Sequence, residues 1–169
     1  KTKLIDGVTC RVVTDVVQKS GIDVEITDDW YAQDTSGNVW YCGEIARDFE
    51  TFTGDEPQEA ELVSIDGSWK SGVDRAVPGV VMFRNPVVGK TYRQEAKFAD
   101  AEDMAEVVSI TGTETTPGAN CSNDCVVTRD FTALEPDHVE MKYYAPGVGL
   151  MLEVNEEGDR TELVLFEAP

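Results

Sequence analysis

The chain has 169 residues, 33 of them acidic and 14 basic, which gives a formal net charge of −19 at pH 7. A field of that sign repels nucleic acid phosphates and anionic membrane surfaces, so neither is an expected partner. The length is typical of one domain that can bury a sizeable core, and a hydrophobic content of 41% excludes wholesale disorder. The acidity indicates either a solvated surface suited to a saline medium or a surface that binds divalent cations.

No apolar run approaches the roughly 18 residues that a membrane-spanning helix needs, so we expect no membrane insertion. The first seven residues, Lys1 to Gly7, contain neither a signal peptide nor an initiating Met. We therefore expect a trimmed chain from which an export signal was removed.

The N-terminal third predicts an antiparallel hairpin. Residues 8–18 are rich in β-branched side chains and end at Lys19-Ser20-Gly21, which predicts a strand and a turn. Residues 22–33 alternate between an apolar and a polar face, as in a half-buried strand. Residues 38–43 form the return arm, and the turn between them is Asp34–Asn38, where Gly37 accepts positive φ.

The rest of the chain predicts many short strands with Gly and Pro between them. A polar stretch over 44–61 is expected to be a mobile excursion or to hold one helical turn. Residues 101–108 have helical propensity, which predicts a short helix or turn feeding a strand. Further strands are predicted at 61–65, 79–83, 90–98, 104–111, 124–132, 138–145, 148–154 and 160–167. This pattern predicts one all-β domain over 1–169 with few short helices, built as an antiparallel open or closed β-barrel or half-barrel.

Four cysteines allow three pairings. Cys121 and Cys125 enclose three residues, a spacing that a tight disulfide loop accommodates. Cys10 and Cys42 lie in predicted strands, and they can pair if those strands bring their Cα atoms within about 7 Å. We predict a disulfide between Cys121 and Cys125, with buried free thiols as the alternative. A zinc site is a weaker reading, because Cys-x3-Cys here has no second close pair.

Several segments resemble a signature found in exported bacterial proteins that have no settled function. It runs through Asp29-Trp-Tyr-Ala-Gln-Asp34, Gly37-Asn-Val-Trp-Tyr41, Gly43-Glu44, Gly67-Ser-Trp-Lys-Ser-Gly-Val-Asp74, Tyr92-Arg-Gln-Glu95, Ala101-Glu-Asp-Met-Ala-Glu106, Leu134-Glu-Pro136 and Lys142-Tyr-Tyr-Ala-Pro-Gly-Val-Gly149. The resemblance implies a periplasmic, secreted or cell-surface protein, an N-terminal signal or lipoprotein sequence, and a further strand before Lys1.

The same resemblance implies a fold similar to periplasmic half-barrel carrier proteins, which wrap around a helix or a ligand. It supplies no catalytic residues. Cys42 stands where an aromatic residue is expected and Cys121 is unusual, whereas a cysteine at position 125 fits. Any disulfide shared across the family is therefore in question.

Aromatic side chains are candidates for a ligand-binding groove, because their rings offer stacking area with polar tips. The candidates are Tyr31, Trp40, Tyr41 and Tyr144, with Tyr143 beside them. The alternative is that strand aromatics form cross-strand pairs and core. We expect Trp69, which follows a Gly-Ser turn, to be a packing anchor.

Two predicted strands place charges of both signs on single faces. Arg93, Glu95 and Lys97 share one face, and His138, Glu140, Lys142 and Tyr144 share another. Such faces permit a polar barrel lumen, in which a buried carboxylate with a raised pKa acts as an acid or base. The alternative is a solvated face with weak ion pairs, worth roughly 0–1 kcal/mol each.

The sequence shows no cofactor or metal motif, so we expect no cofactor. His138 is the chain's single histidine, and with no Gly-x-Ser-x-Gly elbow present we expect it to be exposed and dispensable. Oxygen-rich clusters at 34–38 and at Asn120, Asn123 and Asp124 lack the spaced acids of a calcium loop and are typical of turns.

These observations lead to a hypothesis about function. We expect an exported, non-enzymatic binding or cell-envelope module that holds a small apolar or mixed ligand. The predicted ligand-binding residues are Tyr31, Trp40, Tyr41, Arg93, Glu95, Glu140, Lys142 and Tyr144. Two alternatives stay open: a small lyase, isomerase or hydrolase that uses lumen carboxylates, and an acidic structural surface protein that binds cations. The sequence leaves the ligand and the oligomeric state unknown.

Overall fold

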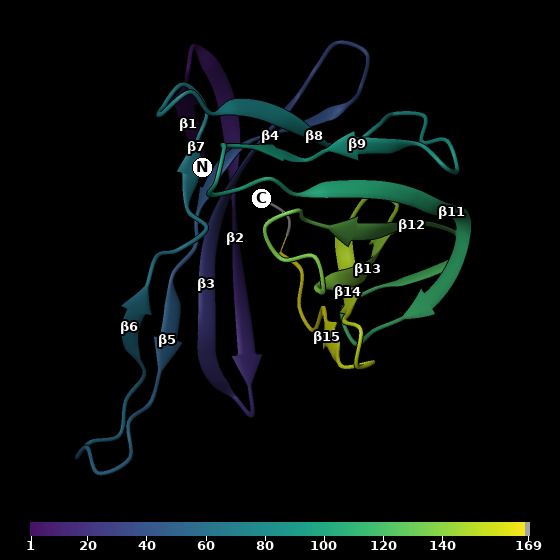
Figure 1. The fold of residues 1–169 in the computed structure, drawn as a ribbon. Coiled ribbons are helices and arrows are strands. Elements are labelled where there is room, and N and C mark those ends of the chain that lie inside the picture. The colour runs from purple at the N-terminus through teal and green to yellow at the C-terminus, as the bar shows by residue number, and fades with distance from the viewer. Residues whose placement is uncertain (168–169) are drawn as a thin grey trace. The chain divides into compact units, whose positions relative to one another are not determined.

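This computed structural model describes residues 1–167, and all of their regular secondary structure is antiparallel β-strand (Figure 1). No helix occurs within those residues. The alternating sequence pattern therefore predicted the fold class correctly. Of the short helix or turn expected over 101–108, the helix is wrong: Ala101 makes an isolated bridge to Lys97. A strand begins at Met104, in agreement with the alternative of a turn that feeds a strand. The β-branched residues Val107, Val108, Ile110 and Thr111 favour strand and override the local helical propensity.

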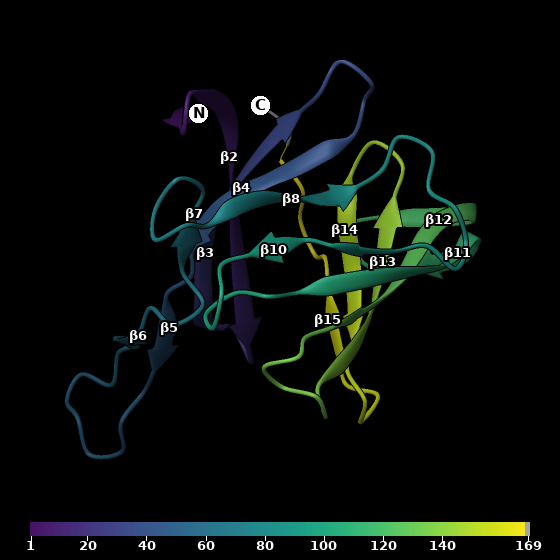
Figure 2. The same cartoon turned by 45° about the horizontal axis from the view of Figure 1, so that its top comes forward.

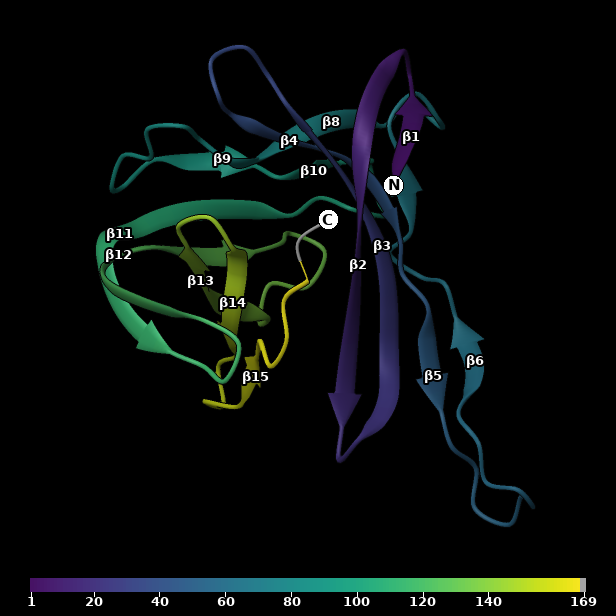
Figure 3. The ribbon, with the colours of Figure 1, turned by 180° about the vertical axis from the view of Figure 1, so that it is seen from behind.

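The strands form two sheets. The first contains β1 (Thr2–Ile5), β2 (Val8–Lys19), β3 (Ile22–Gln33), β4 (Val39–Ile45), β5 (Asp48–Glu50), β6 (Glu61–Ser64), β7 (Trp69–Lys70), β8 (Val77–Met82) and β10 (Glu95–Ala96). Its main path is β1-β2-β3-β4-β8-β10, with β5 and β7 paired to β3 and β4, and β6 paired to β5. Figure 3 shows β2 and β3 as one long hairpin and β5 and β6 as a second.

The second sheet contains β9 (Thr91–Arg93), β11 (Met104–Thr115), β12 (Asn120–Phe131), β13 (Val139–Ala145), β14 (Gly149–Val154) and β15 (Arg160–Glu162). Its order is β15-β14-β13-β12-β11-β9, an open antiparallel path (Figure 2). Short turns join β11 to β12 and β13 to β14, a longer connection over residues 132–138 joins β12 to β13, and β11 curves strongly (Figure 1). This arrangement agrees with the open or half-barrel form of the prediction.

The contacts divide the chain into two compact units, and each is described by itself. Unit 1 comprises Lys1–Val81 with Glu95–Ala101, and unit 2 comprises Met82–Gln94 with the chain from Glu102 onward. The single strand predicted over 90–98 is wrong, because it breaks at Gln94. Its first part, β9, pairs with β11 of unit 2, and its second part, β10, pairs with β8. Arg93 and Glu95 therefore belong to different units.

Strand β4 separates two core clusters of unit 1. Trp30 of β3 pairs with Gly43 and Tyr31 pairs with Tyr41, so Cys42 is an extra residue in the ladder. Cys42 is buried with Ile5, Cys10 and Trp30, whereas Tyr41 is buried with Trp69, Ala76 and Ala101. Consecutive residues of a strand point to opposite faces, so Tyr41 and Cys42 enter different clusters.

The core of unit 2 lies on one face of its sheet. Buried members are Cys121, Cys125, Val127, Ala145, Met151 and Leu152. In the register of β12 to β14, Val127 lies opposite Tyr143, and Tyr143 lies opposite Leu152. The other face of the same strands carries Thr128 opposite Lys142, and Lys142 opposite Glu153. Period-two alternation therefore puts an apolar set and a polar set on opposite sides.

Candidate functional site

A pocket of about 260 Å³ lies in unit 1, where β1, β3, β4 and β7 meet the turns next to β7 and β10. Small-molecule sites span roughly 300–1,000 Å³, so this pocket lies just below that range and fits only a small ligand. Its lining residues are Lys3, Trp30, Glu44, Ile45, Ser68, Trp69, Lys70, Val73 and Lys97.

Gly43 lets β7 approach β4 and so places Trp69 and Lys70 in the lining. It pairs with Lys70, and the neighbouring Glu44 pairs with Trp69. A Cβ atom at position 43 would overlap the Trp69 carbonyl oxygen and would lie 2.8 Å from the Lys70 Cα. Gly43 also has a φ of +126°, a conformation that side chains with a Cβ rarely adopt. Glycine at this position is therefore a structural requirement of the pocket.

Trp30 forms one part of the pocket and is only 3% exposed. Behind it, Cys10 and Cys42 form a disulfide that joins β2 to β4, the strands on either side of β3. The Lys3 ammonium lies 3.5 Å from the centroid of the Trp30 ring, a cation–π contact. Trp30 is thus held by the core and bears a cation on its ring.

Trp69 forms a second part of the lining and is likewise 3% exposed. Its Nε1–H donates to Glu95 Oε1 at 3.2 Å, and its ring meets the Tyr41 ring edge-on at 5.5 Å. The Tyr41 hydroxyl donates in turn to the buried Asp29 carboxylate. Burial raises the pKa of Asp29 to about 7 despite that hydrogen bond. A network of two carboxylates and two aromatic rings therefore fixes the position of Trp69.

Three lysines among the chain's 14 basic residues line this one pocket. Lys97 is paired with Asp100 at 2.9 Å. Within residues 1–167, neither Lys3 nor Lys70 takes part in an ion pair with a carboxylate. Burial and the nearby charge of Lys70 lower the pKa of Lys3. The pocket therefore brings like charges together on a strongly acidic protein.

Of the residues predicted as ligand-binding, Tyr31, Trp40, Tyr41 and Glu95 belong to unit 1. Tyr31 and Tyr41 stack with centroids 4.9 Å apart, and Tyr41 and Glu95 contact Trp69. Trp40 instead donates its Nε1–H to Asp34 Oδ2 at 3.0 Å in the β3–β4 turn. Hydrogen bonds from Trp40 and Asn38 lower the pKa of Asp34 to about 2. The structure thus gathers three of the four around Trp69 and places Trp40 at the hairpin turn.

The other four predicted residues, Arg93, Glu140, Lys142 and Tyr144, belong to unit 2. Lys142 pairs with Glu153 at 2.9 Å and with Glu140 at 3.5 Å. Desolvation opposes the charge of Lys142, but these carboxylates hold its pKa well above the ordinary value. Arg93 is 3.9 Å from Glu102. Lys142 is therefore the centre of a compensated network on the polar face, whereas Arg93 pairs elsewhere.

Asp130 is the most deeply buried acid of that polar face, at 6% exposed. Its Oδ1 accepts a hydrogen bond of 2.5 Å from Thr128, and its Oδ2 is buried with no hydrogen-bond partner. Burial raises its pKa, opposed by the charge of Lys142. Burial also raises the pKa values of Tyr92 and Tyr144 above the ordinary range of tyrosine. The polar face therefore holds a buried carboxylate with a raised pKa, Asp130, which is not among the residues predicted from the sequence.

The unique histidine lies at the surface. His138 is 3.4 Å from Glu140 and 3.7 Å from Glu156, and its side chain is about half exposed. The oxygen atoms of the 34–38 turn accept hydrogen bonds from backbone and side-chain N–H groups of that turn. Over residues 1–167 no group of three or more His, Cys, Asp or Glu side chains is arranged to hold a metal ion.

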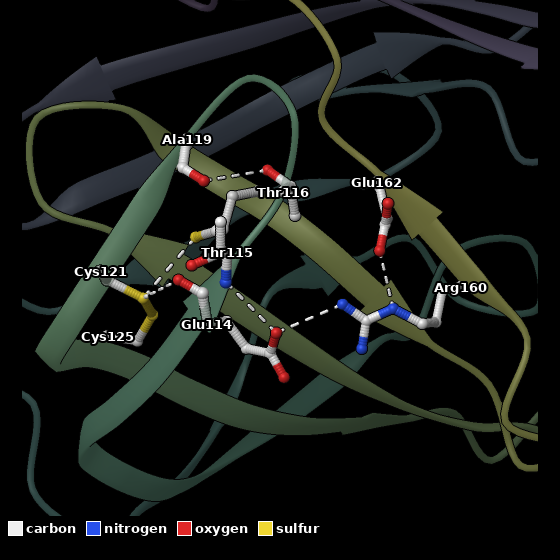
Figure 4. Close-up of polar contacts among 9 residues, drawn as sticks. Glu114, Thr115, Thr116, Ala119, Cys121, Cys125, Arg160 and Glu162 are labelled. Atoms are coloured by element: carbon white, nitrogen blue, oxygen red, sulfur yellow. Dashed lines mark hydrogen bonds and ion pairs between the residues drawn. A yellow bond between two sulfur atoms is a disulfide. The ribbon is translucent and has the colours of Figure 1, made fainter.

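The second disulfide joins Cys121 to Cys125 within β12, the pair whose short spacing suggested a closed loop (Figure 4). The Cys121 sulfur lies 3.7 Å from the Met151 sulfur in the core of unit 2. Nearby, Glu114 of β11 pairs with Arg160 at 3.3 Å, and Arg160 pairs with Glu162 at 2.8 Å (Figure 4). These contacts tie β11 to the last strand, β15.

Comparisons with protein-family models, with curated proteins and with solved structures found no match to this chain. The described residues include no helix of the length and apolarity that crossing a membrane requires.

Sequence reasoning missed the lysines and Trp30 as parts of a site. Lys3, Lys70 and Lys97 are far apart in the sequence, and only the pairing of β4 with β7 and of β8 with β10 brings them to one pocket. Trp69 was expected to be a packing anchor, and it is one, since it belongs to a buried cluster. A usable signal was Gly43, next to the bulge in a strand of large residues, because an interior strand glycine marks a close backbone approach.

Proposed function

We propose that the chain is a non-enzymatic binding module that holds one small molecule in the pocket lined by Trp30 and Trp69. The observation that carries the proposal is a concave site whose aromatic walls are fixed before any ligand arrives. Trp30 is held by the Cys10–Cys42 cluster, and Trp69 is held by Tyr41 and Glu95. A preformed site loses little side-chain entropy on binding, which favours affinity even when the pocket is small.

The proposal gives the predicted residues of unit 1 a supporting role. Tyr41 and Glu95 position Trp69, and Tyr31 stacks on Tyr41. In unit 2, Glu140 and Glu153 neutralise Lys142. Carboxylates engaged in this way stabilise a polar face, which favours a binding module over an enzyme that uses them for acid–base chemistry.

We further propose that the protein is exported. A small β domain with a disulfide in each unit is compatible with an oxidising compartment. The resemblance of the Asp29–Glu44 and Lys142–Gly149 segments to exported bacterial proteins points the same way. Expression with and without an export signal tests this, since thiol labelling reports whether the four cysteines are oxidised.

Filling the pocket tests the binding proposal. Ligand-observed NMR with benzyl alcohol, indole and benzoate should show saturation transfer to at least one probe. Val73→Phe adds bulk at an exposed residue of the lining and should abolish that transfer. Val77→Phe, at an exposed residue outside the lining, is the matched control and should leave it intact. Equal transfer in both variants, or none to the wild type, would refute the pocket as a binding site.

A further inference from the structure

The pocket's charges point to the class of ligand. The chain carries 33 acidic residues, yet the pocket is lined by three lysines and by Glu44 as its carboxylate among the residues described. Counting Lys3, Lys70 and Lys97 against Glu44, the lining has a formal charge of 3 − 1 = +2. On a protein of net charge −19, this lining is a local concentration of positive charge, which favours an anionic ligand over a cationic one.

The three lysines of the lining differ in whether a carboxylate pairs with them. Lys97 is engaged by Asp100, but Lys3 and Lys70 have no ion-pair partner within residues 1–167. Lys3 lies directly over the Trp30 ring. Each ammonium carries three donors, and the two together suit an oxyanion with several acceptor oxygens. Burial and repulsion from Lys70 lower the pKa of Lys3, so an anion beside it would favour its charged form.

The other lining residues indicate the chemistry of the rest of the ligand. Ile45 and Val73 offer apolar surface beside the buried rings of Trp30 and Trp69, and the volume of about 260 Å³ suits a single ring or a short chain. Resting on the proposed function, we infer that the ligand is a small organic anion, with a carboxylate or phosphate head between Lys3 and Lys70 and an apolar body against Trp30 and Trp69. The site therefore has an inferred class of ligand, a small organic anion, and not one particular molecule.

Calorimetric titration of the whole chain with four probes tests the inference: benzoate, phenyl phosphate, benzyl alcohol and inorganic phosphate. We expect benzoate or phenyl phosphate to bind at least about tenfold more tightly than benzyl alcohol, which lacks the charge. Whichever is tighter identifies the head group as carboxylate or phosphate. Inorganic phosphate, which lacks the apolar body, should bind more weakly than phenyl phosphate. Raising the salt concentration should weaken both organic anions and leave benzyl alcohol unaffected.

Variants assign the effect to the two lysines. Lys3→Gln and Lys70→Gln should each weaken the preferred anion by about tenfold and leave benzyl alcohol unchanged. Lys70→Arg keeps the charge and should retain most of the affinity. Lys19→Gln removes an exposed lysine that lies outside the lining and should leave every affinity unchanged, which controls for the loss of net charge.

The outcomes separate the two proposals. If benzyl alcohol binds as tightly as the anions and the lysine variants change nothing, the pocket is a binding site but the anion inference is wrong. If no probe binds to the wild type, both the inference and the proposed function fail. Inorganic phosphate binding as tightly as phenyl phosphate would overturn the assigned role of Trp30 and Trp69.

Discussion

The two units place a partly buried lysine in opposite electrostatic situations. In unit 2, Lys142 has Glu153 at 2.9 Å and Glu140 at 3.5 Å, and its pKa is raised. In unit 1, Lys3 lies on a tryptophan beside another lysine, and its pKa is lowered. A cation that its neighbours fully compensate serves the fold, whereas a cation that its neighbours destabilise is available to a ligand. This difference between Lys142 and Lys3 supports the proposal that unit 1, and not unit 2, binds the ligand.

The tryptophans make this comparison measurable. All three, Trp30, Trp40 and Trp69, belong to unit 1, so tryptophan fluorescence reports unit 1 alone. Tyr92, Tyr143 and Tyr144 belong to unit 2.

The disulfides should differ most between the units. The Cys10–Cys42 bond closes a loop of sequence separation 32, and the Cys121–Cys125 bond closes one of 4. Loop-closure entropy then predicts a loss of about 4 kcal/mol for Cys10→Ala/Cys42→Ala and about 2 kcal/mol for Cys121→Ala/Cys125→Ala. Urea unfolding, followed by tryptophan fluorescence and by circular dichroism, gives both values. A larger loss for the Cys121→Ala/Cys125→Ala variant would contradict the conclusion that the Cys10–Cys42 cluster holds Trp30 in place.

Removing the compensated lysine should cost more stability than removing the uncompensated one. Lys142→Met leaves Glu140 and Glu153 without their cation and should lower the free energy of unfolding by about 3 kcal/mol. Lys3→Met should change it by less than about 0.5 kcal/mol. Because the folded pKa of Lys142 is raised, its contribution is fully present below the ordinary lysine pKa of about 10.4 and is lost as the pH rises through the folded value. Equal losses at neutral pH would remove the contrast between the units.

Asp29 should make the stability of unit 1 depend on pH. Its folded pKa, about 7, exceeds the ordinary 3.8, so the folded state binds the proton more tightly. Stability from this group is therefore greatest below about pH 4 and declines as the pH rises to about 7, a loss of about 2–3 kcal/mol between pH 5 and pH 8. In Asp29→Asn the amide stays neutral, so the variant should lack this decline. Tryptophan-detected unfolding over that pH range checks the difference, and parallel curves for the two proteins would rule out a raised pKa.

The smallest expected change in the free energy of unfolding comes from the close approach of β7 to Gly43. Gly43→Ala should destabilise unit 1 by about 2 kcal/mol, because its Cβ meets the backbone of Trp69 and Lys70. Gly21→Ala is the matched control: it also has a positive φ, at +80°, but nothing lies within 4 Å of its Cβ. Its loss, about 1 kcal/mol, measures the conformational part alone. If both variants lose the same stability, the packing of β7 against Gly43 does not matter.

Much of the fold could be predicted because its strands alternate. Residues 22–33 were predicted from period-two patterning and are found as Ile22–Gln33. The break at Gln94 could not be predicted, because Tyr92 and Glu95 choose different partner strands and pairing between distant segments leaves no local mark. Pairing between distant segments also overrode the helical propensity of 101–108, since β11 pairs with both β9 and β12.

The candidate site was less accessible to sequence reasoning. The residues that line it are ordinary in their local context: Lys70 follows a tryptophan in a two-residue strand, and Lys3 lies in a short N-terminal strand. They are recognised as a site only because they are neighbours in space, where neither Lys3 nor Lys70 forms an ion pair with a carboxylate of residues 1–167. Tyr41 and Glu95 were predicted as ligand-binding residues; in the structure they contact Trp69 and do not line the pocket.

The most direct test of the binding site is the response of the three indole N–H signals of ¹⁵N-labelled protein to benzoate and phenyl phosphate. Trp30 and Trp69 line the pocket, and Trp40 is bonded to Asp34 at the β3–β4 turn, so it serves as an internal control. The account predicts that the first two signals shift together and saturate while the third stays fixed. Uniform shifts of all three signals, or none at all, would contradict it.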